Sequence, residues 1–262
     1  IWKSDINSQD YQKLNNFFWF FSLDLKSNTA ISTLDCYNNQ ITTIDTSNNI
    51  LLSTLILWDN EITSLSLKEN TNLTYLDCEE NKLVSVDLSN NLGLEYLYCS
   101  LNELTKLDIS QNTALNILYC GVNLITNIDV SKNSLLNELI VYSNKLTNLN
   151  ISANTALEYL DCEENQLSSL EVFSNVELLD LIIENNQISR VIDLTNNTKL
   201  ISELLIKGLY LSSNKTFSLN NESSFDGIKS NADSSISAAS IIESLLKYTV
   251  ATSPVSTFFM EE

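Results

Sequence analysis

The sequence contains no histidine, one proline and only four glycines among its 262 residues. Without histidine the chain cannot form Ser-His-Asp or Cys-His catalytic groups, nor a zinc site that depends on imidazole. So few glycines and prolines argue against a β-sandwich or barrel whose turns depend on those residues. Other residues must therefore form the turns of this chain.

Basic residues are also scarce, because 14 lysines and arginines stand against 33 aspartates and glutamates, for a formal net charge of −19. Nucleic acids and anionic membrane surfaces repel such a chain, so neither is expected as a partner. The longest apolar run, residues 17–21, is far shorter than the ~20 residues that cross a bilayer, so no membrane insertion is expected. The chain begins at Ile1 and shows no signal peptide, so we expect a processed product or a fragment.

A repeat of 21 residues runs through most of the chain. One column holds either cysteine or an aliphatic residue, a leucine stands two positions before it in every unit, and an asparagine stands three positions after it. Such self-similarity is typical of a solenoid, in which each coil buries its apolar face against its neighbours. The column consists of Cys36, Leu57, Cys78, Cys99, Cys120, Val141, Cys162 and Ile183, and a second asparagine series consists of Asn28, Asn49, Asn70, Asn91, Asn112, Asn133, Asn154, Asn175 and Asn196.

Each unit contains two short stretches in which apolar and polar residues alternate, for example residues 76–78 and 86–88. Because side chains alternate between the two faces of a strand, this pattern predicts two extended runs and two corners per coil. No helical period is found between residues 34 and 191, so helix content should be low there. The asparagines explain how corners form without glycine, because asparagine bonds to the backbone and tolerates left-handed conformations.

The pattern LxxLxCxxNxLxxLDLSxN, seen in residues 73–91, resembles the leucine-rich repeat family, and most closely its short bacterial class found in Bacteroidetes-type surface proteins. The resemblance covers about residues 14–200. It implies a β-rich solenoid, a right-handed superhelix with one parallel sheet, and a location outside the cell or on a bacterial surface. It also implies a binding surface rather than an enzyme, although the family does not share one activity.

The repeat divides the chain into three parts. Residues 1–30 are expected to form an N-terminal cap and a degenerate first coil, with the aromatic run at 17–21 closing the core. An exposed aromatic binding patch is the alternative for this run. Residues 31–200 form the solenoid, with one extra residue near 191–194 that predicts a bulge. Residues 201–262 are a C-terminal cap, a tail or the start of a further module, and residues 236–250 within them have the pattern of an amphipathic helix.

The cysteines share their column with leucine, valine and isoleucine, so we expect buried free thiols rather than disulfides or a metal site. Asp45, Asp87, Asp108 and Asp129 recur two residues before a serine, which favours a role in capping a corner. Binding of calcium by the carboxylates is the alternative. No cofactor is otherwise expected.

The outward columns that flank the leucine and cysteine of the first run are unusually acidic. Of their 32 positions in eight units, 11 are acidic and none is lysine or arginine, where the chain average would give about four acidic residues. A tyrosine-rich centre, in which Gly121 is expected to leave a dip, lies between acidic ends. The candidate ligand-binding residues are Tyr37, Trp58, Tyr75, Glu79, Tyr96, Tyr98, Tyr119, Tyr142, Tyr159, Glu163 and Glu184.

An apolar, aromatic centre inside a charged rim has the composition of a protein-binding hot spot, so we expect a protein ligand with basic residues. A carbohydrate that stacks on the aromatic rings is one alternative, and a structural spacer that binds nothing is another. An open sheet face offers no deep pocket for a carboxylate-pair enzyme, so no catalytic residue is assigned. The sequence leaves the identity of the ligand and the oligomeric state open.

Overall fold

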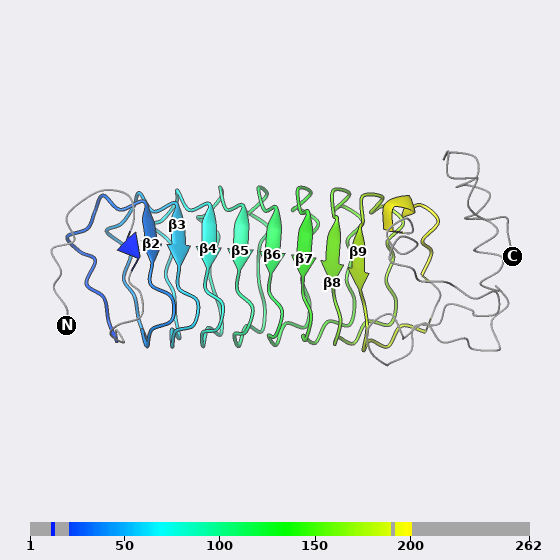
Figure 1. The fold of residues 1–262 in the computed structure, drawn as a ribbon, viewed down its shortest axis with the longest axis horizontal. Helices are drawn as coiled ribbons and strands as arrows, with labels where there is room; N and C mark the ends of the chain where they lie inside the picture. Colours follow the sequence, from blue (N-terminus) through cyan, green and yellow to red (C-terminus); the bar gives the residue numbers. More distant parts are fainter. Residues whose placement is uncertain (1–11, 14–20, 190–191, 201–262) are drawn as a thin grey trace, which may run out of the picture.

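The computed structural model describes residues 12–13, 21–189 and 192–200. The strands within these ranges form one continuous parallel sheet (Figure 1). Nine strands follow one another in the order of the sequence, each paired with the next. They are β1 (Gln12–Lys13), β2 (Thr33–Asp35), β3 (Thr54–Ile56), β4 (Tyr75–Asp77), β5 (Tyr96–Tyr98), β6 (Ile117–Tyr119), β7 (Glu138–Ile140), β8 (Tyr159–Asp161) and β9 (Asp180–Ile182).

Each strand from β2 to β9 is three residues long, with a leucine at its centre. From β2 onward the pairing joins equivalent positions of successive units, for instance Leu76 with Leu97. The backbone ladder continues past the strand, because the Cys78 N–H donates to the Tyr98 carbonyl at 2.8 Å. The 21-residue period therefore sets the register, and identical positions lie in files across the sheet.

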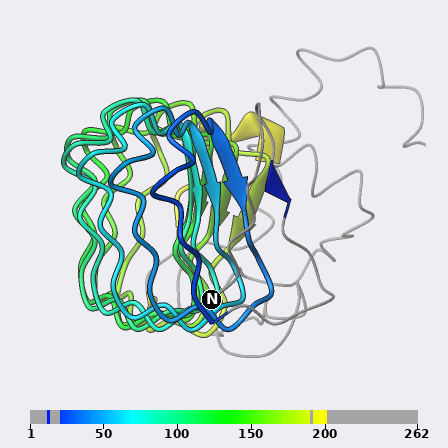
Figure 2. The same ribbon diagram turned by 90° about the vertical axis from the view of Figure 1, so that its left-hand side faces the viewer.

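The second extended run of each unit is not a strand anywhere in residues 21–189. In the third full unit Val86 is half-buried, Asp87 exposed and Leu88 buried, so the predicted alternation is correct. This second run nevertheless pairs into no sheet, because alternation reports which side chains are buried and not whether the backbone pairs. Figure 2 shows the consequence, with the sheet on one side of the coils and strand-free chain on the others.

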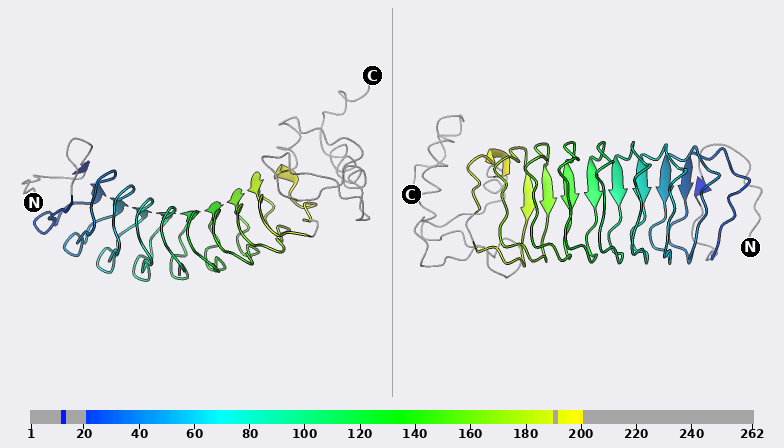
Figure 3. Two further views of the ribbon diagram at one scale, coloured as in Figure 1. Left: turned by 90° about the horizontal axis from the view of Figure 1, so that it is seen from below. Right: turned by 180° about the vertical axis from the view of Figure 1, so that it is seen from behind.

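The solenoid is curved, and the strands lie along its inner side (Figure 3). The coils are wider apart on the outer side, where the chain forms the second run and its corners. The sheet face that points away from the core is therefore concave.

Aliphatic side chains and thiols fill the interior, as the repeat predicted. All five cysteines are free and buried, and Leu97 and Cys99 have no exposed surface. Burial raises the pKa of the Cys120 thiol to about 12, and burial followed by the charge of Asp35 does the same for Cys36. The interpretation of these residues as core thiols is confirmed.

The first asparagine file connects each coil to the one before it. Asn60 is typical: its amide nitrogen donates to the carbonyls of Leu57 and Cys36, both at 3.0 Å, and its amide oxygen accepts from the Ile41 N–H at 3.0 Å. One buried side chain thus forms hydrogen bonds with backbone groups of two coils. Without it, these buried N–H and C=O groups would lack partners.

The left-handed conformation of the corner lies one residue before this file and not on it. Within the described ranges, eight non-glycine residues have a φ between 48° and 56°, and their spacing is that of the repeat. Asparagine occupies only two of these positions, so the expectation that the asparagine files supply the left-handed residues is wrong. The eight are Asn38, Asp59, Glu80, Leu101, Val122, Ser143, Glu164 and Asn185.

The second asparagine file holds the opposite corner. The amide nitrogen of Asn112 donates to the carbonyls of Asn91 (2.8 Å) and Leu88 (3.1 Å), and the same pair of bonds recurs in other coils. Asn197, and not the predicted Asn196, is the fully buried member at the C-terminal end, where it donates to Asn175 at 2.7 Å. The extra residue noted near 191–194 accounts for this shift, although residues 190–191 themselves lie outside the described part.

Most amide oxygens of this second file have no protein partner. Asn70 is an exception, because the Thr46 hydroxyl donates to its amide oxygen at 2.8 Å. Elsewhere the residue equivalent to Thr46 is aliphatic, for example Val130 beside Asn154. The buried oxygens without a protein hydrogen bond are those of Asn49, Asn91, Asn112, Asn133, Asn154, Asn175 and Asn197.

The recurring aspartates cap the second corner, as predicted. Asp45 accepts bonds from the Ser47 N–H (3.0 Å) and hydroxyl (2.6 Å), and these bonds lower the pKa of its carboxyl. Asp87, Asp108 and Asp129 bond to the following serine in the same way. Within the described ranges no group of three or more Cys, Asp and Glu side chains is arranged to hold a metal ion.

Several predictions fall on residues outside the described part. These are the helix at 236–250, most of the aromatic run at 17–21, and the nature of residues 201–262. Phe21 is described and its side chain is 65% exposed, so the core-closing role is wrong for this residue. In the part of the chain that the structure describes, no helix is long and apolar enough to cross a membrane.

Candidate functional site

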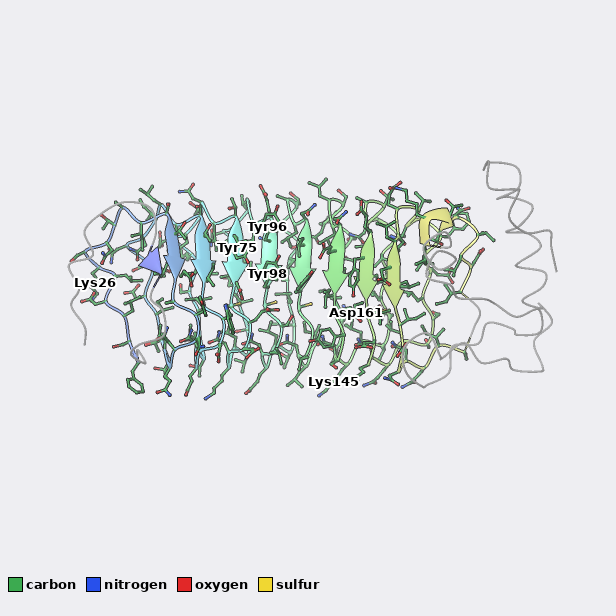
Figure 4. All side chains as sticks on the ribbon, in the orientation of Figure 1. Lys26, Tyr75, Tyr96, Tyr98, Lys145 and Asp161 are labelled. Carbon is green, nitrogen blue, oxygen red and sulfur yellow. The ribbon has the colours of Figure 1, made fainter. Side chains whose placement is uncertain are left out.

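The concave sheet face carries the candidate residues. In each unit the first and third strand residues and the residue two after the strand point to this side, because side chains alternate about the buried leucine and cysteine. Tyr75, Tyr96 and Tyr98 lie over β4 and β5, whereas Lys145 lies away from the strands (Figure 4). From β2 to β9 the outward columns contain no lysine, whereas Lys13 of β1 stands in register with Asp35. Lys82 pairs with Glu61 at 3.1 Å at a corner.

Four tyrosines form a continuous cluster across β4, β5 and β6, here called the tyrosine cluster: Tyr75, Tyr96, Tyr98 and Tyr119. The ring centroids of Tyr75 lie 5.9 Å from Tyr96 and 5.4 Å from Tyr98, with tilted planes. Tyr98 meets Tyr119 edge to face at 4.9 Å. All four side chains are half-buried, so the rings support one another and still reach solvent.

A second aromatic pair lies nearer the N-terminal end of the face. Tyr37 and Trp58 are equivalent positions of adjacent coils, and their rings stack with centroids 4.9 Å apart and an interplanar angle of 7°. They occupy the column that follows β2 and β3, at the edge of the face. The aromatic surface is therefore divided into two groups, which the sequence pattern did not distinguish.

Gly121 does not leave the predicted dip. The ring of Tyr142, from the next coil, lies over it, so that a β-carbon at position 121 would come within 2.4 Å of that ring. The glycine is buried and the space above it is filled. The expectation of a hollow is wrong, because a neighbouring side chain in the same file covers the glycine.

Glu138 joins the tyrosine cluster through a hydrogen bond that sequence reasoning did not assign. The Tyr119 hydroxyl donates to its carboxylate at 2.5 Å. Burial first, and then this bond and the charge of Glu138, raise the pKa of Tyr119. The signal for the contact is the diagonal relation between the third residue of β6 and the first residue of β7, which side chains of this length can bridge.

Carboxylates crowd one another beside β4. Burial, followed by the charges of Glu79, Asp35 and Glu80, raises the pKa of Asp77 to about 7, although a bond from the Glu79 N–H (3.2 Å) opposes the shift. Burial and the charge of Asp77 raise the pKa of Tyr75 to about 12. The face therefore concentrates several carboxyl groups beside β4.

The same arrangement recurs beside β8. The Glu163 N–H donates to Asp161 at 3.1 Å, and burial raises the pKa of both Asp161 and Glu163. Nearby carboxylates, Asp180 for Asp161 and Asp161 itself for Glu163, add to the shift. Two acidic ends thus enclose the tyrosine cluster.

Comparison with solved structures finds many matches. The functional domain of InlJ from Listeria monocytogenes, described as including a cysteine ladder, is 37% identical over 68% of this chain and 40% of that one, with a TM-score of 0.67. An internalin C2 from Listeria monocytogenes is 27% identical over 64% of this chain and 77% of that one, with a TM-score of 0.58. The fold is a leucine-rich repeat solenoid.

Other leucine-rich repeat structures share this fold at lower identity. A complex of Latrophilin 3, Unc5D and the leucine-rich repeats of FLRT2 matches at 23% identity over 66% of this chain and 60% of that one, with a TM-score of 0.55. The present chain spans only 40% of the length of the InlJ domain. No family model and no curated protein matches the sequence.

The leucine-rich repeat register places all the candidate residues on the concave face or at its edge, and all are half-buried. It brings Tyr75, Tyr96, Tyr98 and Tyr119 into one cluster and pairs Tyr37 with Trp58. Tyr142 covers Gly121, and Tyr159, Glu163 and Glu184 belong to the acidic C-terminal end. A role in binding any ligand stays a prediction for each of them.

Proposed function

We propose that the concave face binds a protein whose contact surface is basic. The observation that carries this proposal is the tyrosine cluster enclosed between two acidic ends, on a face whose outward columns from β2 to β9 contain no lysine. Tyrosine is enriched in binding hot spots, because its ring buries a large area at a small loss of conformational entropy. The carboxylates around it favour a cationic partner and speed its approach.

The related structures support a binding role in general terms, because leucine-rich repeat proteins such as those of the FLRT2 complex take part in protein assemblies. We also propose that the chain works outside the cell or on a bacterial surface, on the likeness to InlJ and internalin C2. Cell fractionation with an antibody to the chain tests the location. Recovery from the cytoplasm alone would contradict it.

The binding proposal is tested with a panel of purified extracellular protein domains, half of them with a basic surface and half neutral. We expect immobilised wild-type protein to retain basic domains, with an affinity that falls as salt rises. The triple variant Tyr96→Ala, Tyr98→Ala and Tyr119→Ala should bind at least about tenfold more weakly. The matched control is Thr105→Ala, Thr126→Ala and Thr147→Ala, three exposed positions outside the strands of the sheet.

Each other outcome overturns the proposal. If both triple variants weaken the binding of basic domains equally, the concave face is not the binding surface. Signal on a glycan array without retention of any basic domain would assign a carbohydrate ligand instead. Retention of nothing, by folded wild-type protein at low salt, would favour a structural spacer.

A further inference from the structure

The concave face contains the same seven-residue segment twice. Residues 75–81 and 159–165 both read Tyr-Leu-Asp-Cys-Glu-Glu-Asn, and they begin at β4 and β8 respectively. In each segment the N–H of the first glutamate donates to the aspartate two residues before it, at 3.2 Å for Glu79 and 3.1 Å for Glu163. Both asparagines donate to the carbonyls of the cysteine and first glutamate of their own segment. The two segments therefore share these local hydrogen bonds, although Asp161 is buried (8% exposed) and Asp77 is half-buried.

Each segment sets a tyrosine ring beside two carboxylates on the solvent side of the sheet. Tyr75 and Asp77 are the first and third residues of β4, and Glu79 lies two residues beyond, so all three point the same way. Tyr159, Asp161 and Glu163 repeat this set on β8. An aromatic face next to carboxylates suits arginine better than lysine, because a guanidinium stacks on the ring and bonds to a carboxylate with two N–H groups.

The separation of the two sets is fixed by the sheet. Four strand-to-strand steps join β4 to β8. At ~4.8 Å per step the two sets lie about 19 Å apart. The other members of the tyrosine cluster, Tyr96, Tyr98 and Tyr119, occupy the face between them together with Glu138. A bound segment would therefore cross aromatic surface between its two charged contacts.

We infer that the partner brings two arginine side chains, about 19 Å apart along the solenoid axis, to two equivalent subsites: Tyr75, Asp77 and Glu79, and Tyr159, Asp161 and Glu163. The inference rests on the proposed function, since it names what the acidic ends recognise. Two subsites on a rigid sheet select a partner by the spacing of its charges as well as by their sign. Linking two weak contacts at the matching distance raises affinity without any new contact.

Polyproline peptides that carry two arginines at fixed separations can test this spacing. They rise ~3.1 Å per residue and complete a turn in three residues, so arginines three, six or nine positions apart point to the same side at about 9, 19 or 28 Å. The three peptides carry identical charge. We expect the peptide with five prolines between its arginines to bind about tenfold more tightly than those with two or eight, in NMR titrations of the tyrosine rings at low salt.

Variants of one subsite at a time provide the decisive comparison. Either Asp77→Asn with Glu79→Gln, or Asp161→Asn with Glu163→Gln, should abolish the preference for the middle spacing and change the affinity of the other two peptides no more than about twofold. The control pair Asp87→Asn and Asp108→Asn removes the same charge from exposed corners and should keep the preference. Replacing both arginines with citrulline, which is neutral, should abolish binding, and lysine should weaken it.

The outcomes separate this inference from the proposed function. Equal affinity for the three spacings, or a preference that survives loss of either subsite, overturns the two-site inference. If basic domains are retained in the earlier experiment and no arginine peptide binds, the two subsites are wrong and the proposed function stands. If neither basic domains nor peptides bind, both fail.

Discussion

Among the eight described residues with a left-handed backbone, Val122 is the one with a β-branched side chain. It has a φ of 49°, in the left-handed region, where a β-branched side chain is disfavoured more strongly than asparagine. The equivalent residue is asparagine at positions 38 and 185. Its N–H still donates to the Tyr142 carbonyl at 2.9 Å, so the coil-to-coil contact maintains the conformation against the local preference.

We therefore expect Val122→Asn to raise the free energy of unfolding by about 1 kcal/mol, because it removes left-handed strain and leaves the backbone bond in place. Urea unfolding followed by circular dichroism measures the change. The reciprocal variant, Asn38→Val, should lower the same quantity by a similar amount. A stabilising or neutral Asn38→Val would show that position 38 tolerates valine and that the strain is not real.

Asp77 makes stability depend on pH in the opposite direction from the corner aspartates. Its pKa is raised to about 7 in the folded chain, so the folded state keeps a proton that the unfolded state releases near pH 4. Stability from this group is present at low pH and falls as pH rises from about 4 to about 7. Asp161, whose pKa is also raised, acts in the same sense.

The expected result is a higher thermal midpoint at pH 5.5 than at pH 8, and a smaller difference in Asp77→Asn. Asparagine keeps an oxygen to accept the Glu79 N–H, which makes the comparison one of charge. The pKa values of Asp45 and Asp108 are lowered, so the stability from those groups is lost only as pH falls below about 4. An unchanged pH dependence in Asp77→Asn would contradict the assignment.

At the scale of the elements, the corner built by the second asparagine file leaves hydrogen-bond acceptors unpaired, because most of its buried amide oxygens have no protein donor. The Thr46 hydroxyl donates to the amide oxygen of Asn70, whereas Val130 has no donor for the amide oxygen of Asn154. The backbone contacts are the same in both corners. The Asn154 amide nitrogen donates to the Val130 carbonyl at 3.0 Å, and the Asn70 amide nitrogen donates to the Thr46 carbonyl at 3.1 Å. The two corners share their backbone contacts and differ in one hydroxyl. Valine and threonine have nearly the same shape, so exchanging them tests that hydroxyl alone.

We expect Val130→Thr to leave the free energy of unfolding unchanged or to raise it, whereas a buried threonine without a partner would lower it by about 1–3 kcal/mol. The reverse variant, Thr46→Val, should lower it by about 1 kcal/mol, because Asn70 loses its donor. Both values come from urea unfolding. If Val130→Thr destabilises the protein as much as Thr46→Val does, the amide oxygen of Asn154 is not the acceptor that we assign.

The elements that repetition encodes were predictable, and those that depend on a single neighbour were not. Leu97 and Cys99 could be placed in the core because every unit carries an apolar residue at their positions. The left-handed position is occupied by Leu101, Val122 and Glu164 among others, so no shared chemistry marks it. The ring of Tyr142 above Gly121, and the bond from Tyr119 to Glu138, depend on side-chain rotamers that a column pattern does not contain.

At the scale of the whole molecule, each coil is stabilised by its contacts with the adjacent coils. Each strand contacts only the strand before it and the strand after it, so a coil near an end has fewer stabilised neighbours to rely on than a central one. The five buried thiols report this, because they are distributed from the coil of β2 to the coil of β8. A thiol becomes reactive only when its coil opens.

We expect iodoacetamide in mildly denaturing urea to modify Cys36 and Cys162 before Cys99, because opening starts at the ends of a solenoid. Mass spectrometry of proteolytic fragments measures each rate. In the absence of urea all five thiols should resist modification, since each is buried. Equal rates for the five thiols would show that the solenoid opens as one unit.

The shared register of the coils also has a consequence at the level of the gene. A unit gained or lost by recombination between similar DNA segments would keep every file aligned, since adjacent coils pair equivalent residues. Where such an event falls between β4 and β8, it would lengthen or shorten the distance between the two matching segments by ~5 Å. Variation in copy number would then change which targets fit, without altering a single contact residue.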